Sequence, residues 1–425
     1  MSIIAAIFVF AYVLITLEHP LKMNKSAIAL VAAGLMWTVH SLVSPLGIHA
    51  VTEQLTEKLS ETAAIVFFLI CAMTIVEVVD AHGGFDVVTS RIRAKRLSTL
   101  MWLVAIIAFF LSAVLDNMTT TIVMVTMLRK LLAERKHRLL FAGVVVIAAN
   151  AGGAWSPMGD VTTTMLWIGG QITAVEIVKS LLIPSMVNML VPIFLLTPFM
   201  KGKVEAPDRK ESSRIAVSQF ERNLAFFLGM GSLVSVPVFK SLTHLPPYMG
   251  MFLALGVIWT VGEFLHRNKT DSEKDGLSLA KALKRIDMSS VIFFIGILLS
   301  VSVLSVNGTL SGLAGWLTSH ISAESVIVIV IGVISAVVDN IPIVASVMGM
   351  FPLAQHPADS FIWEFLAYCA GTGGSMLIIG SAAGVAAMGI EKIEFFWYVR
   401  RIAPLALAGY VGGAAVYMIQ YAAMH

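Results

Sequence analysis

The chain has 425 residues, of which 58% are hydrophobic and only 13% are charged. Soluble globular proteins carry about 25% charged residues, so this composition excludes an ordinary soluble domain. Runs of about 20 apolar residues recur along the chain, and each is long enough to cross a bilayer as a helix. The sequence therefore predicts an all-α polytopic membrane protein surrounded by lipid, and a net charge of +3 does not indicate a nucleic-acid partner.

The N-terminal apolar run and the two cysteines carry little further information. The run that begins at Ile3 has no basic segment before it, as a secretory signal peptide normally has. We interpret it as the first membrane helix; a signal peptide removed upstream of residue 1 remains the alternative. Cys71 and Cys369 lie far apart in apolar runs, which argues against a disulfide framework or a thiolate metal site.

Hydrophobicity predicts ten spans, two of them broken, and two shorter re-entrant hairpins. In the first half we expect spans at Ile3–Leu17, Ser26–Val43 and Ala63–Val79, a hairpin at Thr99–Leu128, a broken span at Leu140–Ile168 and a span at Leu181–Met200. In the second half we expect spans at Leu224–Phe239, Met249–Leu265 and Ser289–Val306, a hairpin at Ser325–Met350, a broken span at Phe361–Gly389 and a span at Phe396–Tyr421.

The basic residues fall unevenly between the predicted loops. With the N-terminus outside, all 29 Lys and Arg except Lys58, Lys179 and Lys240 lie in cytoplasmic segments, as the positive-inside rule favours. This predicts an inner-membrane protein with both termini outside. Each half has five spans, so the second half begins on the opposite side. We therefore expect inverted repeats at 1–200 and 223–425, joined by a cytoplasmic linker at 201–222, an arrangement typical of secondary transporters.

A duplicated motif supports the two halves. Ser-Ala-Val-Leu-Asp-Asn at Ser112–Asn117 returns as Ser-Ala-Val-Val-Asp-Asn at Ser335–Asn340, 223 positions later. A Gly-rich segment follows each copy, at Asn150–Asp160 and at Gly371–Ser381. An acid inside an apolar run is costly in a membrane and marks a functional site by default.

These motifs carry oxygen atoms of the kind that alkali cations bind. The candidate ion and proton ligands are Asp116, Asn117, Thr120, Asn150, Asp160, Asp339, Asn340 and, in a neighbouring span, Glu77. We expect Na⁺ at Asp116, Asn117 and Asp160, with carbonyls at Gly152 and Gly153, where Pro157 and Gly159 help to interrupt the helix. The competing interpretations are helix caps for the Asp-Asn pairs, a kinked packing helix for the glycines, and structural hydrogen bonds for Asp160 and Glu77.

The predicted chemistry is ion exchange without a cofactor. A buried carboxylate is harder to ionise, so protons and Na⁺ can compete for Asp160, whose counterpart in the second half is Ser381. The sequence contains no metalloprotease, nucleophile-elbow or nucleotide-binding motif, which argues against an enzyme or a primary pump. No Lys or Arg lies near the predicted site in the sequence, which counts against the alternative of an anion or arsenite transporter. An intramembrane enzyme or a channel is a third alternative.

Three motifs together resemble the NhaD-type sodium/proton antiporters of the ion transporter superfamily, nearly end to end. They are the first Asp-Asn motif with its following Met-Thr-Thr-Thr, the Gly-rich segment Asn150–Asp160, and Thr-Ile-Val-Glu-Val-Val-Asp-Ala-His-Gly-Gly-Phe at Thr74–Phe85. The resemblance implies a homodimer of inverted repeats, a transport domain that moves against a scaffold, and a polar role for Thr163. It implies exchange of cytoplasmic Na⁺, and Li⁺, for external H⁺ by alternating access of the elevator type.

The tips of the two hairpins depart from related dicarboxylate carriers, which have Ser-Asn-Thr there. The matching positions read Asp116-Asn117-Met118 and Asp339-Asn340-Ile341. An added negative charge at each tip would repel a carboxylate substrate, so this departure favours small inorganic cations.

Overall fold

The computed structural model describes residues 3–16, 23–45, 47–89, 94–204, 217–267, 269–270, 274, 276–321, 323–336 and 340–424. In these ranges the chain is helical, with one isolated β-bridge between Arg96 and Lys203. The first half contains α1 (Ile3–Thr16), α3 (Lys25–Val43), α4 (Gly47–Ala81), α5 (Asp86–Thr89), α6 (Leu97–Ser112), α7 (Asn117–Leu131), α8 (Arg135–Ala154), α9 (Val161–Ile168), α10 (Ala174–Leu196) and a 3-10 turn (Thr197–Phe199).

The second half follows a similar order. It contains α11 (Gln219–Thr243), α12 (Pro247–His266), α14 (Leu279–Arg285), α15 (Met288–Val306), α16 (Thr309–His320), α17 (Glu324–Ile334), α18 (Asn340–Met350), α19 (Phe361–Gly373), α20 (Ala382–Glu391), α21 (Phe395–Arg401) and α22 (Ala403–Met424). Within the described residues, eight helices are long and apolar enough to cross a membrane. The predicted class, an α-helical multi-pass membrane protein, is confirmed.

Some boundaries differ from the predicted ones. Helix α4 has 35 residues and begins well before the predicted span at Ala63–Val79, because its polar first part contains no helix breaker. At about 1.5 Å per residue it is about 52 Å long, which exceeds the roughly 30 Å hydrocarbon core. The predicted span Phe396–Tyr421 is divided at Ile402 into α21 and α22. Helix α16 was not predicted, since its 12 residues are too few to span.

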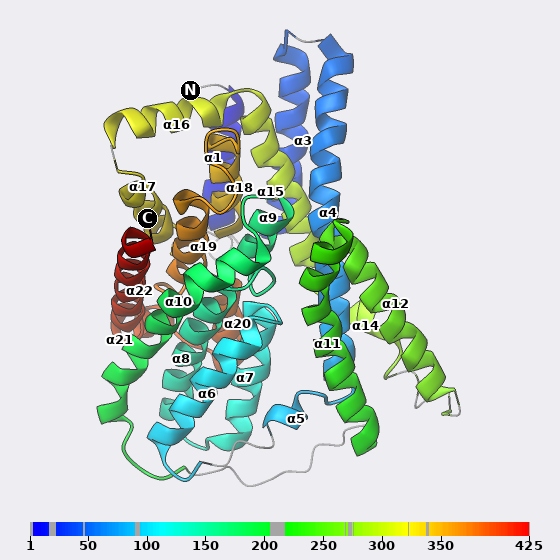
Figure 1. Cartoon of the computed structure of the whole chain (residues 1–425), viewed down its shortest axis with the longest axis vertical. Helices are drawn as coiled ribbons and strands as arrows, with labels where there is room; N and C mark the ends of the chain where they lie inside the picture. Colours follow the sequence, from blue (N-terminus) through cyan, green and yellow to red (C-terminus); the bar gives the residue numbers. More distant parts are fainter. Residues whose placement is uncertain are drawn as a thin grey trace.

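The helices form two groups, and in Figure 1 the helices α3, α4, α11, α12 and α14 of one group lie to the right of the other group. We call α1, α3, α4, α11, α12, α14 and α15 the flanking helices, which pack mainly on one another. We call α6–α10, α17–α20 and α22 the central helices, and α18 and α9 contact the flanking α15 and α4. We name the end with α5 and the start of α11 the lower end, and the end with α16 the upper end (Figure 1).

Two pairs of short central helices match the predicted hairpins. Helices α6 and α7 meet at the tip Ala113–Asp116, and α17 and α18 have 11 residues each. Eleven residues reach about 17 Å, roughly half of a hydrocarbon core. The connection 337–339, which contains the predicted ligand Asp339, lies outside the described residues.

Two pairs of central helices match the predicted broken spans. Helices α8 and α9 are separated at Trp155–Asp160, and α19 and α20 at Gly374–Ser381. The prediction that Gly152 and Gly153 interrupt the helix is wrong, because α8 continues to Ala154. The interruption begins at Trp155, three residues after Gly152, and contains Pro157, which has no N–H to donate to a preceding turn.

Contacts at the hairpin tips repeat between the two halves. The Ser112 hydroxyl donates to the Ala149 carbonyl at 2.6 Å, and the Ser335 hydroxyl donates to the Ala370 carbonyl at 2.9 Å. A Cβ on Gly152 would lie 2.1 Å from the Phe109 carbonyl oxygen. A Cβ on Gly373 would lie 2.1 Å from the Gly332 carbonyl oxygen. Each hairpin therefore packs its backbone directly against a glycine of the following broken helix.

A buried acid joins the two halves at the lower end of the central helices. Glu391, at the end of α20, pairs with Arg129 of α7 at 2.7 Å and with Arg138 of α8 at 3.2 Å. Its side chain is only 2% exposed. Arg129 also donates to the Ile390 carbonyl, so one guanidinium group binds both a side chain and the last turn of α20.

Candidate functional site

The side chain of Asp160 lies where the hairpins and broken helices meet. Asp160 caps α9, and its Oδ1 accepts the Thr162 N–H at 3.0 Å. Its Oδ2 accepts the Asn117 amide at 2.7 Å and approaches the Asn340 amide at 3.5 Å. The side chain is almost fully buried. One carboxylate therefore contacts the first turn of a helix from each Asp-Asn motif.

Asn150 extends this cluster into the second half. Its Oδ1 accepts the Asn117 amide at 3.0 Å, and its Nδ2 donates to Ser375 at 2.8 Å and to Ser381 at 2.9 Å. Ser381 occupies the position that matches Asp160 and caps α20 through the Gly384 N–H. Polar side chains of both halves thus form one buried network, in which Asp160 supplies a carboxylate.

Asp116 belongs to the same region but has separate partners. Its Oδ1 accepts the Thr119 N–H at 2.7 Å, and its Oδ2 accepts the Thr119 hydroxyl at 2.5 Å. These contacts make Asp116 the N-cap of α7, as the alternative interpretation of the motif predicted. The side chain is half-buried and lines a cavity that also reaches Asp160.

Buried hydroxyls lie beside these caps. The hydroxyls of Thr120, Thr121 and Thr162 are buried without a hydrogen-bond partner among the described residues. Buried polar atoms are normally satisfied, so unpaired hydroxyls mark places where water or an ion can bind. Thr163, in contrast, donates to the main-chain carbonyl of Asp160 at 2.9 Å and approaches that of Gly153 at 3.5 Å. Its hydroxyl supports the break in the helix.

Glu77 lies away from the cluster, toward the lower end of α4. Its Oε1 pairs with Arg285 Nη1 at 3.3 Å, at the end of α14. The sequence had indicated no basic residue near any predicted site residue, and for Glu77 that expectation is wrong. The two residues are more than 200 positions apart, so only the fold brings them together.

Two cavities lie between the flanking and the central helices. One of about 240 Å³ is lined by site residues Asp116, Asn117, Asp160 and Asn340 and, nearer the lower end, by Glu77. Lys25, Asp80, Arg285 and Asp287 also line it. A second cavity, of about 770 Å³, lies toward the upper end and is lined by residues that include Lys58, Glu61, Gln171 and Tyr248.

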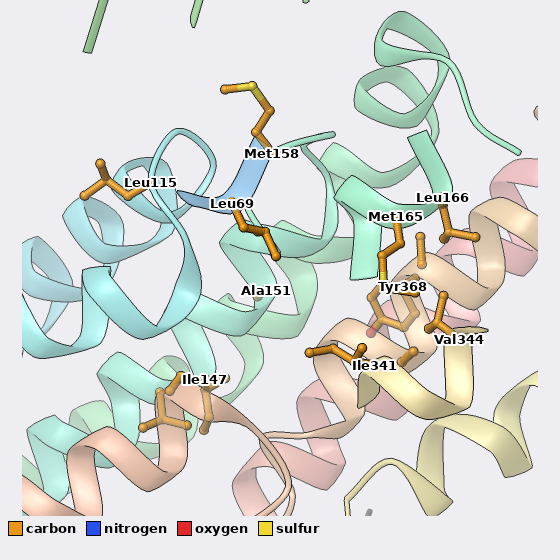
Figure 2. Close-up of a cluster of buried hydrophobic side chains, with 14 of the residues drawn as sticks. Leu69, Leu115, Ile147, Ala151, Met158, Met165, Leu166, Ile341, Val344 and Tyr368 are labelled. Carbon is orange, nitrogen blue, oxygen red and sulfur yellow. The ribbon is translucent and has the colours of Figure 1, made fainter. Parts of the chain in front are cut away.

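Four buried apolar side chains lie where the linings of the two cavities meet. On each of the helices α4, α9, α15 and α18, a residue that lines one cavity lies within about one helical turn of a residue that lines the other. At this level lie the buried side chains of Leu69, Met165, Phe294 and Ile341, which we call the collar. Figure 2 shows Leu69, Met165 and Ile341 within a cluster of buried hydrophobic side chains.

The network around Asn150 and the separate Glu77 pair both include residues that the predicted ligand set did not contain. Ser375 and Ser381 bind Asn150, and Arg285 binds Glu77. The 221-position offset between the Gly-rich segments points from Asp160 to Ser381, but no sequence signal points to Ser375 or Arg285. Among the described residues, no three His, Cys, Asp or Glu side chains gather as a metal site would need.

Comparisons with known proteins agree with this arrangement. A family profile described as citrate transporter (CitMHS) matches residues 12–365. Sodium/proton antiporter 2 of Arabidopsis thaliana is 46% identical over 97% of this chain and 98% of its own length, and antiporter 1 is 49% identical over 97% and 71%. The Na⁺/H⁺ antiporter NhaD of Alkalimonas amylolytica is 34% identical over 97% and 89%.

A solved structure shares the fold. The YdaH transporter of Alcanivorax borkumensis superposes with a TM-score of 0.58 over 93% of this chain and 96% of that one, at 12% identity. The antiporter relatives are similar along nearly the whole chain, and they are transporters rather than enzymes, as the absence of catalytic motifs predicted. The chain therefore belongs to the NhaD-type family of sodium/proton antiporters, which are secondary transporters.

Proposed function

We propose that the chain exchanges cytoplasmic Na⁺, and Li⁺, for external H⁺ at the network centred on Asp160. The observation that carries this proposal is a buried carboxylate held by amides from both Asp-Asn motifs, next to unpaired threonine hydroxyls. The names of the relatives, sodium/proton antiporters, support the same ions.

The proposed chemistry is competition at one carboxylate. In the structure, Asn117 donates its amide N–H₂ to Asp160, which stabilises the negative charge. Na⁺ needs oxygen ligands, so in the loaded state the Asn117 and Asn150 amides turn their oxygens toward the ion. We assign further ligands to Thr120, to Asp116, to the Gly152 and Gly153 carbonyls, and to Asp339 and Asn340. A proton on Asp160 removes the charge and releases Na⁺.

We propose that the two halves are inverted repeats, at 1–200 and 223–425. The paired contacts of Ser112 and Ser335, and of Gly152 and Gly373, support this symmetry. We place the lower end in the cytoplasm, with both termini outside in the inner membrane, because the predicted cytoplasmic loops carry most of the basic residues. The linker 201–222 then lies in the cytoplasm as well.

We propose alternating access of the elevator type, in which the central helices move against the flanking ones. Cavities on both sides of the apolar collar, along the contact between these two groups, support such a movement. The described structure then corresponds to an inward-facing state, since the cavity at the lower end reaches Asp160. We also propose a homodimer, which native mass spectrometry in detergent would detect as twice the mass of the chain.

Transport of an organic anion is the second candidate. The citrate-transporter description of the matching profile favours it, and so do Lys25 and Arg285 on the wall of the cavity. Asp160 and Asp116 at the inner end of the same cavity would repel a carboxylate, which is why we rank cation exchange first.

The test is a vesicle assay with an imposed pH gradient. Added Na⁺ or Li⁺ should collapse the gradient in wild-type vesicles and should leave it intact with Asp160→Asn, which keeps the size of the side chain. Labelled citrate uptake is measured in parallel. Wild-type vesicles that ignore both cations but accumulate citrate would overturn the proposal in favour of the second candidate.

A further inference from the structure

The ion pair between Glu77 and Arg285 lies on the wall of the cavity that leads to Asp160. Both residues line the cavity, and both belong to the flanking helices α4 and α14. Their side chains are 25% and 43% exposed, so water and dissolved ions reach them. An exposed ion pair contributes little to stability, about 0–1 kcal/mol. Its position within the cavity therefore suits a role in handling ions.

The surroundings of the pair are mixed in charge. Asp80 and Asp287 line the same part of the cavity, and Lys25 lies on its wall with its ammonium group over the Phe293 ring. Asp287 is engaged as the N-cap of α15, through Ser290. Glu77 is therefore a carboxylate on the cavity wall that pairs with Arg285, a long side chain with many rotamers at the end of the short helix α14.

We infer that Arg285 is a tethered cation that competes with entering Na⁺ for the Glu77 carboxylate. The guanidinium group occupies Glu77 when no ion is present, and an ion that arrives from the lower end displaces it on its way to Asp160. The pair thereby sets the apparent Na⁺ affinity at this entrance without touching the ion in its final site. This inference rests on the proposed function.

Electrostatics fixes the direction of the effect. A positive charge at the entrance repels Na⁺, and a unit charge a few ångströms away in a partly aqueous cavity changes cation binding by roughly three- to tenfold. Loss of Arg285 should therefore lower the Na⁺ concentration needed for half-maximal exchange. Loss of Glu77 should raise it, because the guanidinium group remains without its carboxylate. Salt should shrink both effects, since the Debye length falls to about 3 Å at 1 M.

The experiment uses everted membrane vesicles, in which the cytoplasmic face is outside. The KM for Na⁺ and the maximal rate are measured for wild type, Arg285→Gln, Glu77→Gln, Arg285→Lys and the double variant. We expect KM to fall roughly three- to tenfold in Arg285→Gln and to rise by a similar factor in Glu77→Gln. Arg285→Lys should stay near wild type, and the double variant should lie between the single ones.

Lys284 provides the matched control. It precedes Arg285 in α14, carries the same charge, is exposed and does not line the cavity. Lys284→Gln should leave KM unchanged. If Arg285→Gln does not fold, the inference is tested by whether KM for Na⁺ rises in Glu77→Gln. Wild-type exchange with unchanged KM in both Arg285→Gln and Glu77→Gln would overturn this inference alone. Wild-type vesicles that ignore Na⁺ would overturn the proposed function with it.

Discussion

At the scale of single residues, Asp116 and Asp160 each begin a helix, yet their carboxylates have different partners. Asp116 binds its own helix through Thr119, whereas Asp160 also binds Asn117 from a hairpin. An Asn side chain can cap a helix as well as an Asp side chain can, but Asn has no negative charge with which to bind a cation. Substitution by Asn therefore separates these two roles.

For Asp116 we predict that Asp116→Asn keeps the thermal stability of the protein and loses most of the Na⁺/H⁺ exchange. Asp116→Ala should lose exchange and also about 1 kcal/mol of stability, because the Thr119 N–H loses its acceptor. Thermal unfolding in detergent and the vesicle assay measure the two effects. Full exchange by Asp116→Asn would show that Asp116 acts as a helix cap and does not bind the ion.

His82 lies outside the membrane spans and makes the stability of the protein depend on pH. His82 follows α4, and its Nε2 lies 3.2 Å from the Nε2 of His266. Burial lowers the pKa of His82, and nearby Lys269 lowers this pKa further. The Val78 carbonyl and Glu221 act in the opposite direction. The folded state then binds fewer protons than the unfolded state at pH values between this lowered pKa and the usual histidine pKa of about 6.5. Stability is therefore lost as the pH falls from about 6.5 through the lowered pKa.

We predict that the melting temperature decreases from pH 8 to pH 5, a range chosen to bracket about 6.5, and that His82→Gln removes part of this decrease. His49→Gln is the control, since His49 is an exposed histidine of α4. Melting curves in detergent across this pH range provide the measurement. An identical pH dependence for wild type and His82→Gln would contradict the assignment.

Much of the site could be predicted from the sequence, because an Asp or Asn inside an apolar run is rare enough to notice. Asn117, Asn150, Asp160 and Asn340 do lie in one network. Ser375 could not be predicted, because serine is common in membrane helices and only the meeting of α8 with the second Gly-rich segment gives it a partner. Glu77 could be identified, but its partner Arg285 could not.

At the scale of helices, the hairpins were predictable because each Asp-Asn motif divides an apolar run that is long enough for two short helices. The exact position of the helix break could not be predicted, because glycine is compatible with both a helix and an interruption. In α8 the decisive factor is tertiary packing: Gly152 stays helical and brings the Phe109 carbonyl close to the helix axis.

We predict that Gly152→Ala is destabilising by about 1–3 kcal/mol, because its Cβ would meet the Phe109 backbone, which has no free rotamer to move away. The same displacement would shift the hairpin tip that carries Asn117, so exchange should fall as well. Gly256→Ala in α12 is the control: a Cβ there meets nothing within 4 Å, and stability should rise by up to about 1 kcal/mol. Thermal unfolding of both variants measures the difference, and equal effects would contradict the packing argument.

At the scale of the whole molecule, the two cavities and the apolar collar between them suggest a path for ions. Hydrophobic constrictions of this kind block ions because they do not hold water. The arrangement of the flanking and central helices around this path was beyond the reach of the sequence. Helix α16 and the long start of α4 have the composition of ordinary loops or amphipathic segments.

We predict that polar substitutions in the collar, such as Leu69→Ser with Met165→Ser, allow Na⁺ to cross without proton exchange. The smaller hydroxyl side chains would let water join the two cavities. Uptake of ²²Na⁺ without an imposed pH gradient measures the leak. Leu100→Ala is the control, because Leu100 is buried in α6 but lines neither cavity. Equal leaks in both variants would show that loss of packing alone is responsible.

The network around Asn150 also constrains how the protein is made. Its partners Ser375 and Ser381, and the acid Glu391 that joins α7, α8 and α20, all come from the last part of the chain. During synthesis, Asp116 and Asp160 find Thr119 and Asn117 within the first half, but the Asn150 amide enters the bilayer before its acceptors Ser375 and Ser381 exist. Contacts of such long sequence separation form late. The network around Asn150 is thus completed only after the second half has been made, and until then the Asn150 amide depends on water or on the insertion machinery.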